Sequence, residues 1–130
     1  MPWSSLEEIF NNASLSKYIF LWHDLGATQS YKNITGKKSV SQKNKMTRLR
    51  KVVNILSEYL DKDVMISPKP IGDTYQNWKE NTLKQSIHAS SKCFESLEGV
   101  QGMEKFQCID EMSMSVFIRI IAKHERNLEV

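Results

Sequence analysis

The clearest hydrophobic pattern in the chain lies between Met46 and Leu60. Apolar residues recur there at steps of three and four, and charged or amide side chains fill the positions between them. This spacing places the apolar residues along one side of an α-helix. The apolar positions are Met46, Leu49, Val52, Val53, Leu56, Tyr59 and Leu60. The pattern therefore predicts an amphipathic helix over residues 46–60.

Two shorter apolar runs precede this helix. Ser4 with Glu7, or Ser5 with Glu8, has the spacing of a capping box, which predicts a short first helix that ends at Asn11 and Asn12. The run from Tyr18 to Leu25 is apolar on nearly every side, which predicts a second helix in the centre of the core. A buried strand is the alternative for this run, because aromatic and β-branched residues also favour strands.

Two longer helices are predicted in the second half of the chain. Asp73 and Gln76 have capping-box spacing, and the helix they begin should run to about Leu97. Its expected inner face is Tyr75, Trp78, Leu83, Ile87, Ser90 and Phe94 or Cys93. The last helix is predicted from Met103 to Glu125. Its apolar positions are Phe106, Ile109, Met112 or Ser113, Val116, Phe117, Ile120, Ile121 and His124.

A connector over residues 61–72 separates the two halves. It contains Pro68 and Pro70, which remove amide donors and favour extended backbone. A brief strand at residues 64–66 is conceivable there. The chain has 130 residues, with 40% hydrophobic and 25% charged residues, which are values typical of globular domains. We therefore expect a single all-α domain over residues 1–130, a compact bundle of about five helices.

Positive charge is concentrated in one stretch. Residues 25–57 hold eight Lys or Arg and no Asp or Glu, whereas the rest of the chain holds ten Lys or Arg against fifteen acids. The net charge of +3 hides this asymmetry. Residues 27–45 contain Gly36 and many Ser, Thr and Asn, which predicts a long basic loop between the second and third helices. Loops of this length in a compact domain are usually functional or disordered.

Motifs for catalysis or cofactor binding are absent from the sequence. It has no nucleophile elbow, phosphate-binding loop, zinc-protease or CxxC pattern. Three His and two Cys lack the spacing of metal ligands. We therefore expect no enzyme activity, no metal and no cofactor. Cys93 and Cys108 are expected as reduced thiols, with a single bridge as the alternative.

The sequence contains no run of about 18 apolar residues and no visible signal peptide. An intracellular, non-membrane protein is therefore expected. Short basic runs such as Lys43 to Lys51 also resemble nuclear-localisation signals, which suggests the nucleus.

The acid-free basic stretch favours a nucleic-acid partner. Each Lys or Arg that neutralises a phosphate releases a counterion, and the Arg fork also matches the guanine edge. We therefore predict a non-enzymatic nucleic-acid-binding domain, with DNA expected ahead of RNA. The candidate binding residues are Lys37, Lys38, Lys43, Lys45, Arg48, Arg50 and Lys51.

A helical protein-interaction or oligomerisation module is the alternative function. The predicted helix from Met103 to Glu125 is long and has a broad apolar stripe, so it could pack against a second copy or another protein. Acidic partner surface could equally meet the basic loop.

Overall fold

The structure, a computed structural model of the chain, describes residues 10–25 and 40–128. The side chains of residues 40–43, 45, 127 and 128 lie outside this description. The described residues are helical or irregular and form no strand, which confirms the all-α class. Residues 10–12 are helical. The elements that follow are η1 (Leu15–Lys17), α2 (Tyr18–Asp24), α4 (Val40–Ser57), α5 (Tyr75–Ser96), η2 (Met103–Lys105), η3 (Ile109–Glu111) and α6 (Met114–Leu128).

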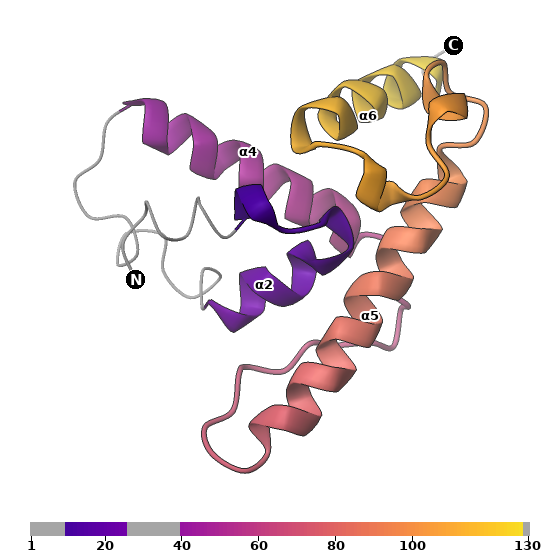
Figure 1. Ribbon diagram of the computed structural model, residues 1–130. Helices are drawn as coiled ribbons and strands as arrows, with labels where there is room; N and C mark the ends of the chain where they lie inside the picture. The colour runs from indigo at the N-terminus through magenta and orange to yellow at the C-terminus, as the bar shows by residue number, and fades with distance from the viewer. Residues whose placement is uncertain (1–9, 26–39, 129–130) are drawn as a thin grey trace.

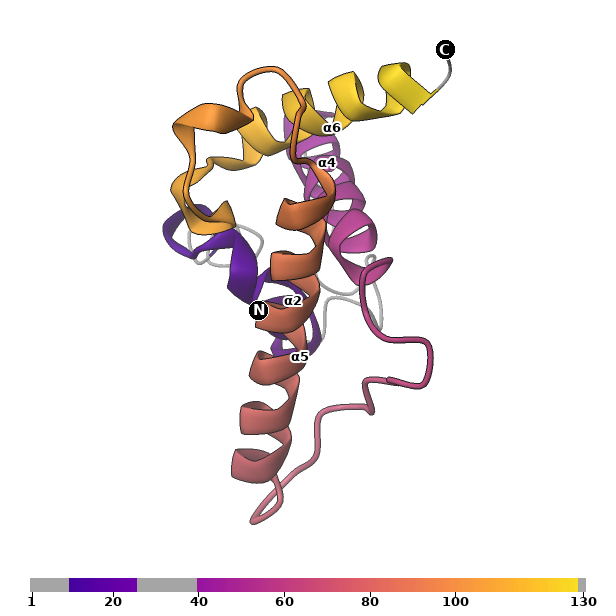
Figure 2. The ribbon, with the colours of Figure 1, turned by 90° about the vertical axis from the view of Figure 1, so that its right-hand side faces the viewer.

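Helix α5 is the longest element and extends beyond the rest of the bundle at its N-terminal end (Figure 1). The short η1–α2 segment packs on it, and α2 also contacts α4. Figure 2 shows α6 lying across the top of the molecule, above α4 and the C-terminal end of α5. Because α2 is an α-helix over Tyr18–Asp24, the helical prediction for Tyr18–Leu25 is right, and the alternative of a buried strand is wrong.

Helix α4 buries the predicted apolar stripe. Met46, Leu49, Val52, Val53 and Leu56 are all buried and belong to one hydrophobic core that also includes residues of α2, α5 and α6. The bounds differ from the prediction, because the helix begins at Val40 and ends at Ser57. Residues 40–45 are therefore helical, whereas the sequence predicted them as loop. Residues 26–39, the remainder of the predicted basic loop, lie outside the described residues.

The buried face of α5 is made of smaller residues than the sequence predicted. Ile87 is 46% exposed, and Leu83 is only half-buried. The buried residues are Trp78, Thr82, Ser86, Ala89, Ser90 and Cys93. Apart from Trp78, these side chains are small, which allows the η1–α2 backbone to approach closely, and Ser86 bonds to it directly. The predicted cap is also wrong, because Thr74, not Asp73, is the N-cap residue.

The single helix predicted from Met103 to Glu125 does not form. Two short 3-10 turns, η2 and η3, occupy its first half, and the helix proper begins at Met114. The backbone is extended at Phe106, Cys108 and Met112, which interrupts any continuous α-helix. The Glu111 carboxylate accepts hydrogen bonds from the backbone amides of Gln107 and Cys108, which stabilises the second turn.

The connector after α4 has no strand and is fastened at a few points. Trp78 Nε1 donates a hydrogen bond to the carbonyl oxygen of Ser67 over 2.9 Å. Lys69 Nζ and the Tyr75 hydroxyl both bond to Asp24 at the end of α2. The ring of Phe20 packs 5.9 Å from that of Trp78. These contacts hold the connector against the junction of α2 and α5.

None of the helices that the structure describes has the length and hydropathy needed to cross a membrane. The two cysteines are both free thiols; Cys93 is buried and Cys108 exposed, so the alternative of a bridge between them is wrong.

Candidate nucleic-acid interface

Helix α4 carries positive charge without any negative charge. Its 18 residues include five Lys or Arg and no Asp or Glu. Cations in the first turns of a helix are disfavoured by the helix dipole, so their presence there does not serve helix stability. The five cations are Lys43, Lys45, Arg48, Arg50 and Lys51.

Three of these cations project from the solvent side of a buried helix. Arg48, Arg50 and Lys51 are exposed, while Met46 and Leu49 of the same helix are almost fully buried. The core therefore fixes the helix axis, and the cationic side chains are held on a rigid base. A rigid base lowers the entropy lost when the side chains bind an anion.

The exposed side of α4 has a definite arrangement of charge. Arg48 and Lys51 are three positions apart and are therefore neighbours on the helix surface. Arg50 lies farther round the exposed side, beyond Lys51. Asn44 and Thr47 are exposed on the same side and add polar groups suited to phosphate oxygens. No ion pair joins Arg48, Arg50 or Lys51 to an acid within residues 10–25 and 40–128.

The other predicted residues are placed less completely. Lys43 and Lys45 belong to the first turns of α4, although their side chains are outside the description. Lys37 and Lys38 lie outside the described residues altogether. The structure thus brings five of the seven predicted residues onto one helix.

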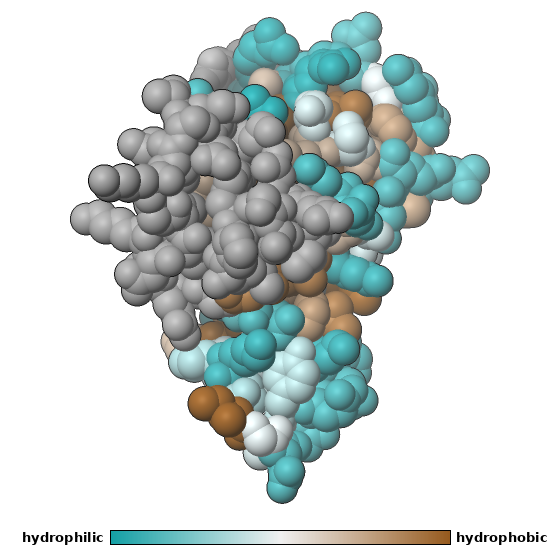
Figure 3. Space-filling view, turned by 60° about the vertical axis from the view of Figure 1, so that its left-hand side comes forward, coloured by the Kyte–Doolittle hydropathy of each residue, from teal (hydrophilic) through white to brown (hydrophobic). Residues whose placement is uncertain are grey.

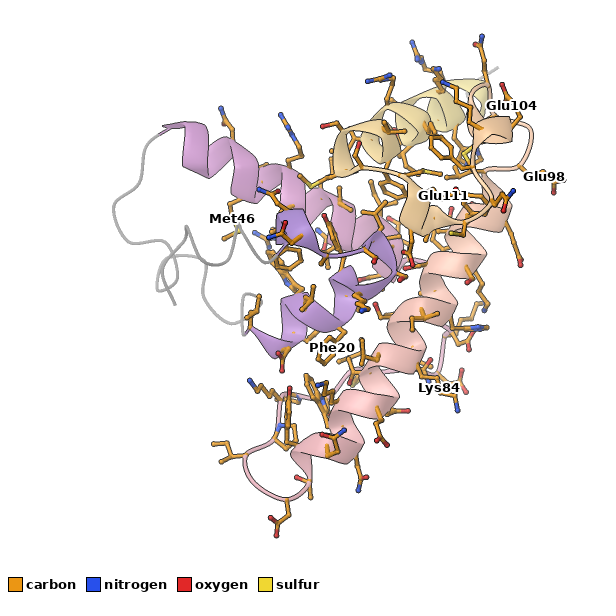
Figure 4. The ribbon with its side chains drawn as sticks, in the orientation of Figure 1. Phe20, Met46, Lys84, Glu98, Glu104 and Glu111 are labelled. Carbon is orange, nitrogen blue, oxygen red and sulfur yellow. The ribbon has the colours of Figure 1, made fainter. Side chains whose placement is uncertain are left out.

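A second basic cluster lies on the C-terminal part of the chain and was missed in the sequence. Lys105, Arg119 and Lys123 surround a small hollow of about 80 Å³ whose walls include Phe106 and Val116. The four-residue step from Arg119 to Lys123 is the signal that could have revealed it. In Figure 4, side chains that end in nitrogen rise from α4 and from α6 on the same upper side of the molecule.

The surface beside this interface offers no broad apolar area. Figure 3 brings the left side of Figure 1 forward and shows hydrophobic atoms only in small patches among hydrophilic ones on the coloured residues.

Groups suited to nucleophilic or metal chemistry are not assembled in the described part of the chain. No three His, Cys, Asp or Glu residues gather there in a way that could hold a metal ion. Burial lowers the pKa of His23. Burial also raises the pKa of the Cys93 thiol to about 12, against an opposing hydrogen bond from Tyr59, so this thiol is a poor nucleophile.

Comparisons with known proteins identify no relative of this chain. No protein-family model matches it, and neither the curated proteins nor the solved structures contain a significant match. A functional assignment therefore rests on the charge and geometry of its own residues.

Proposed function

We propose that this protein binds nucleic acid, DNA ahead of RNA, through the exposed basic side of α4. The observation that carries the proposal is the helix itself: 18 residues with five cations and no acid, with Arg48, Arg50 and Lys51 exposed above a buried apolar stripe.

The chemistry of the interface follows from phosphate neutralisation. Each Lys or Arg that contacts a phosphate releases counterions, so affinity falls with salt by a slope of about 0.9 per contact on duplex DNA. An α-helix fits the major groove of B-DNA, where the guanidinium groups of Arg48 and Arg50 could pair with guanine edges. Lys51, Lys43 and Lys45 would serve as phosphate contacts that set the position of the helix.

The test is a fluorescence-anisotropy titration of a labelled 20-base-pair duplex and of the matching single strand at several salt concentrations. We expect the triple substitution R48A/R50A/K51A to lower affinity at least tenfold and to reduce the salt slope by about 2 to 3 units. Circular dichroism should be unchanged, because these side chains are exposed.

The matched control removes three exposed cations from other surfaces. The K17A/K62A/K84A variant has the same change in net charge, and its affinity should stay within a few-fold of the unchanged chain. Equal losses in the two triple variants would mean that net charge alone drives binding. No binding to either strand form at low salt would reject the proposal.

Nuclear location is a corollary of the proposal. The run from Lys43 to Lys51 would then also act as an import signal, and a fluorescent fusion with R48A/R50A/K51A should lose nuclear enrichment.

A further inference from the structure

A groove runs along one side of α5, away from the basic side of α4. It consists of two adjoining hollows, of about 530 and 550 Å³, that share Phe94 and Glu95 in their walls. The first reaches the turn between α5 and η2, and the second reaches Ile87 and η3. Each hollow has a volume in the range of ligand-binding pockets.

Apolar side chains line the groove. Phe94 lies at the centre, Ile87 and Ile109 line one hollow, and Met103 and Phe106 line the other. Ile87 is 46% exposed, whereas Ser86 and Ser90 of the same helix are fully buried. The cost of leaving apolar side chains exposed would be recovered if a partner covered them.

Carboxylates surround the same groove. Glu95, Glu98 and Glu104 border the first hollow, and Asp110 borders the second. Among the residues that the structure describes, Lys17 is the only cation in the walls of either hollow. Figure 4 shows Glu98 and Glu104 at the outer edge of the molecule, beside the turn that follows α5. The groove therefore combines an apolar floor with a negative rim.

We propose that this groove binds a cationic amphipathic segment of a partner protein, one in which Lys or Arg residues alternate with aliphatic residues. The carboxylates of the rim would attract the Lys or Arg residues of the segment, and the apolar floor would bury its aliphatic side chains. A second copy of α4 does not fit this description. Its described exposed side chains are Asn44, Thr47, Arg48, Arg50, Lys51 and Asn54, none of which is apolar. The groove thus adds a protein-binding site that is separate from the basic side of α4, although it shares Phe106 with the hollow beside Arg119 and Lys123.

The experiment uses the full chain and three fluorescein-labelled peptides of twelve residues. One contains leucine and lysine, the second has glutamate in place of lysine, and the third has serine in place of leucine. We expect saturable binding of the leucine–lysine peptide and at least tenfold weaker binding of the other two. Equal affinity for the serine–lysine peptide would reduce the interaction to non-specific charge attraction and overturn the proposal.

Variants locate the peptide on the protein. E95Q/E98Q/E104Q should weaken binding of the leucine–lysine peptide about tenfold, as expected for three partly solvated charge pairs. E58Q/E80Q/E125Q, which neutralises three exposed glutamates elsewhere, should leave affinity within twofold. Equal effects of the two triple variants would contradict the proposed site.

Further variants test the apolar floor of the groove and the identity of the molecule that occupies it. Ile87→Ser should weaken peptide binding several-fold, whereas Ile71→Ser, at a residue that is 99% exposed outside the groove, should not. R48A/R50A/K51A should leave peptide binding unchanged, which separates this test from that of the nucleic-acid proposal. Self-association in sedimentation that E95Q/E98Q/E104Q abolishes would assign the groove to a second copy and overturn the proposal.

Discussion

The Ser86 hydroxyl donates a hydrogen bond to the carbonyl oxygen of Ser16 over 2.6 Å, although the two residues lie 70 positions apart. The same hydroxyl oxygen accepts the amide of Phe20 at 3.4 Å. Ser86 is fully buried, so water cannot replace either bond. One small side chain of α5 therefore satisfies two backbone groups of the N-terminal segment at the point where η1 passes into α2.

Removing this hydroxyl should destabilise the fold. Ser86→Ala leaves a buried carbonyl and a buried amide with poorer partners, and we expect a loss of about 1–3 kcal/mol in the free energy of unfolding. Urea denaturation followed by circular dichroism measures it. Ser90 is the matched control, since it is equally buried on the same helix but its hydroxyl has no hydrogen-bond partner among the described residues. Ser90→Ala should therefore be neutral or stabilising, and an equal loss in both variants would contradict the assigned role of Ser86.

The two thiols should differ sharply in reactivity. Burial raises the pKa of Cys93 to about 12, so almost none of this thiol is ionised at pH 8, while Cys108 is exposed. Only the thiolate reacts with iodoacetamide. We expect one fast modification per chain in the native state and two in urea, measured by mass spectrometry. Cys108→Ser should abolish the fast modification; a fast reaction that persists in this variant would mean that Cys93 is accessible.

Asp61 should titrate below the ordinary range of a carboxyl group. A hydrogen bond from Lys92 lowers its pKa, and the charges of Lys92 and His88 act in the same direction while desolvation opposes them. His88 Nε2 lies 3.7 Å from Asp61 Oδ2. Because the folded-state pKa lies below the unfolded value, the group stabilises the fold above the unfolded pKa of about 3.9, and this contribution is lost as the pH falls through the folded pKa.

An NMR titration of the Asp61 side-chain carboxyl measures this shift. Lys92→Met should move its pKa upward, whereas Lys84→Met, at an exposed residue two turns away on α5, should leave it unchanged. An Asp61 pKa that does not respond to Lys92→Met would show that the pair does not form in solution.

The second basic cluster should extend the nucleic-acid footprint. If duplex DNA reaches from α4 to α6, R119A/K123A should weaken binding several-fold and reduce the salt slope by up to about 1.8 units, which corresponds to two phosphate contacts. Anisotropy titrations at several salt concentrations measure both quantities. Binding that is unaltered in this variant would confine the interface to α4.

The helix from Val40 to Ser57 shows what periodicity predicts well. The sequence predicts its buried stripe at Met46, Leu49, Val52, Val53 and Leu56, and all five are buried. A charged helix with a single apolar face can bury only that face against the core, so the prediction is reliable for it. Its first six residues were predicted as loop. After Val40 they are polar or cationic and give no periodic signal, although the backbone continues the helix through them.

The region after Met103 shows where periodicity misled. Met103, Phe106, Ile109 and Met112 are spaced by threes, and this spacing predicts part of the apolar stripe of an α-helix. A strict three-residue step also fits 3-10 turns, with three residues per turn. Two such turns with extended links place Met103, Ile109 and Met112 in the core. The continuous helix predicted from Met103 to Glu125 is therefore wrong in its first half, whereas the protein interaction predicted for it stays a prediction.

Hydrophobic periodicity does not identify most of the inner face of α5, because several of its buried residues are polar. Thr82, Ser86 and Ser90 are spaced by fours and are buried; of these three the sequence predicts only Ser90 on the inner face, with Leu83 and Ile87 in place of Thr82 and Ser86. The spacing was visible in the sequence, but hydroxyl side chains are usually surface residues. The same error hid the groove, because Ile87 and Phe94 were assigned to the core rather than to a surface that a partner could cover.

The place of the N-terminal segment has a consequence for how the chain folds. Ser16 bonds to Ser86 and, through its amide and hydroxyl, to the carboxylate of Asp110, which lies 94 positions later. Most small helical proteins fold fast because their contacts are local, whereas pairings across such separations require large loops to close first. During synthesis, the segment from Leu15 to Asp24 must wait until about residue 110 has emerged before its contacts can be complete. Until then its aromatic residues, including Trp22, are incompletely covered and can bind chaperones or form non-native contacts.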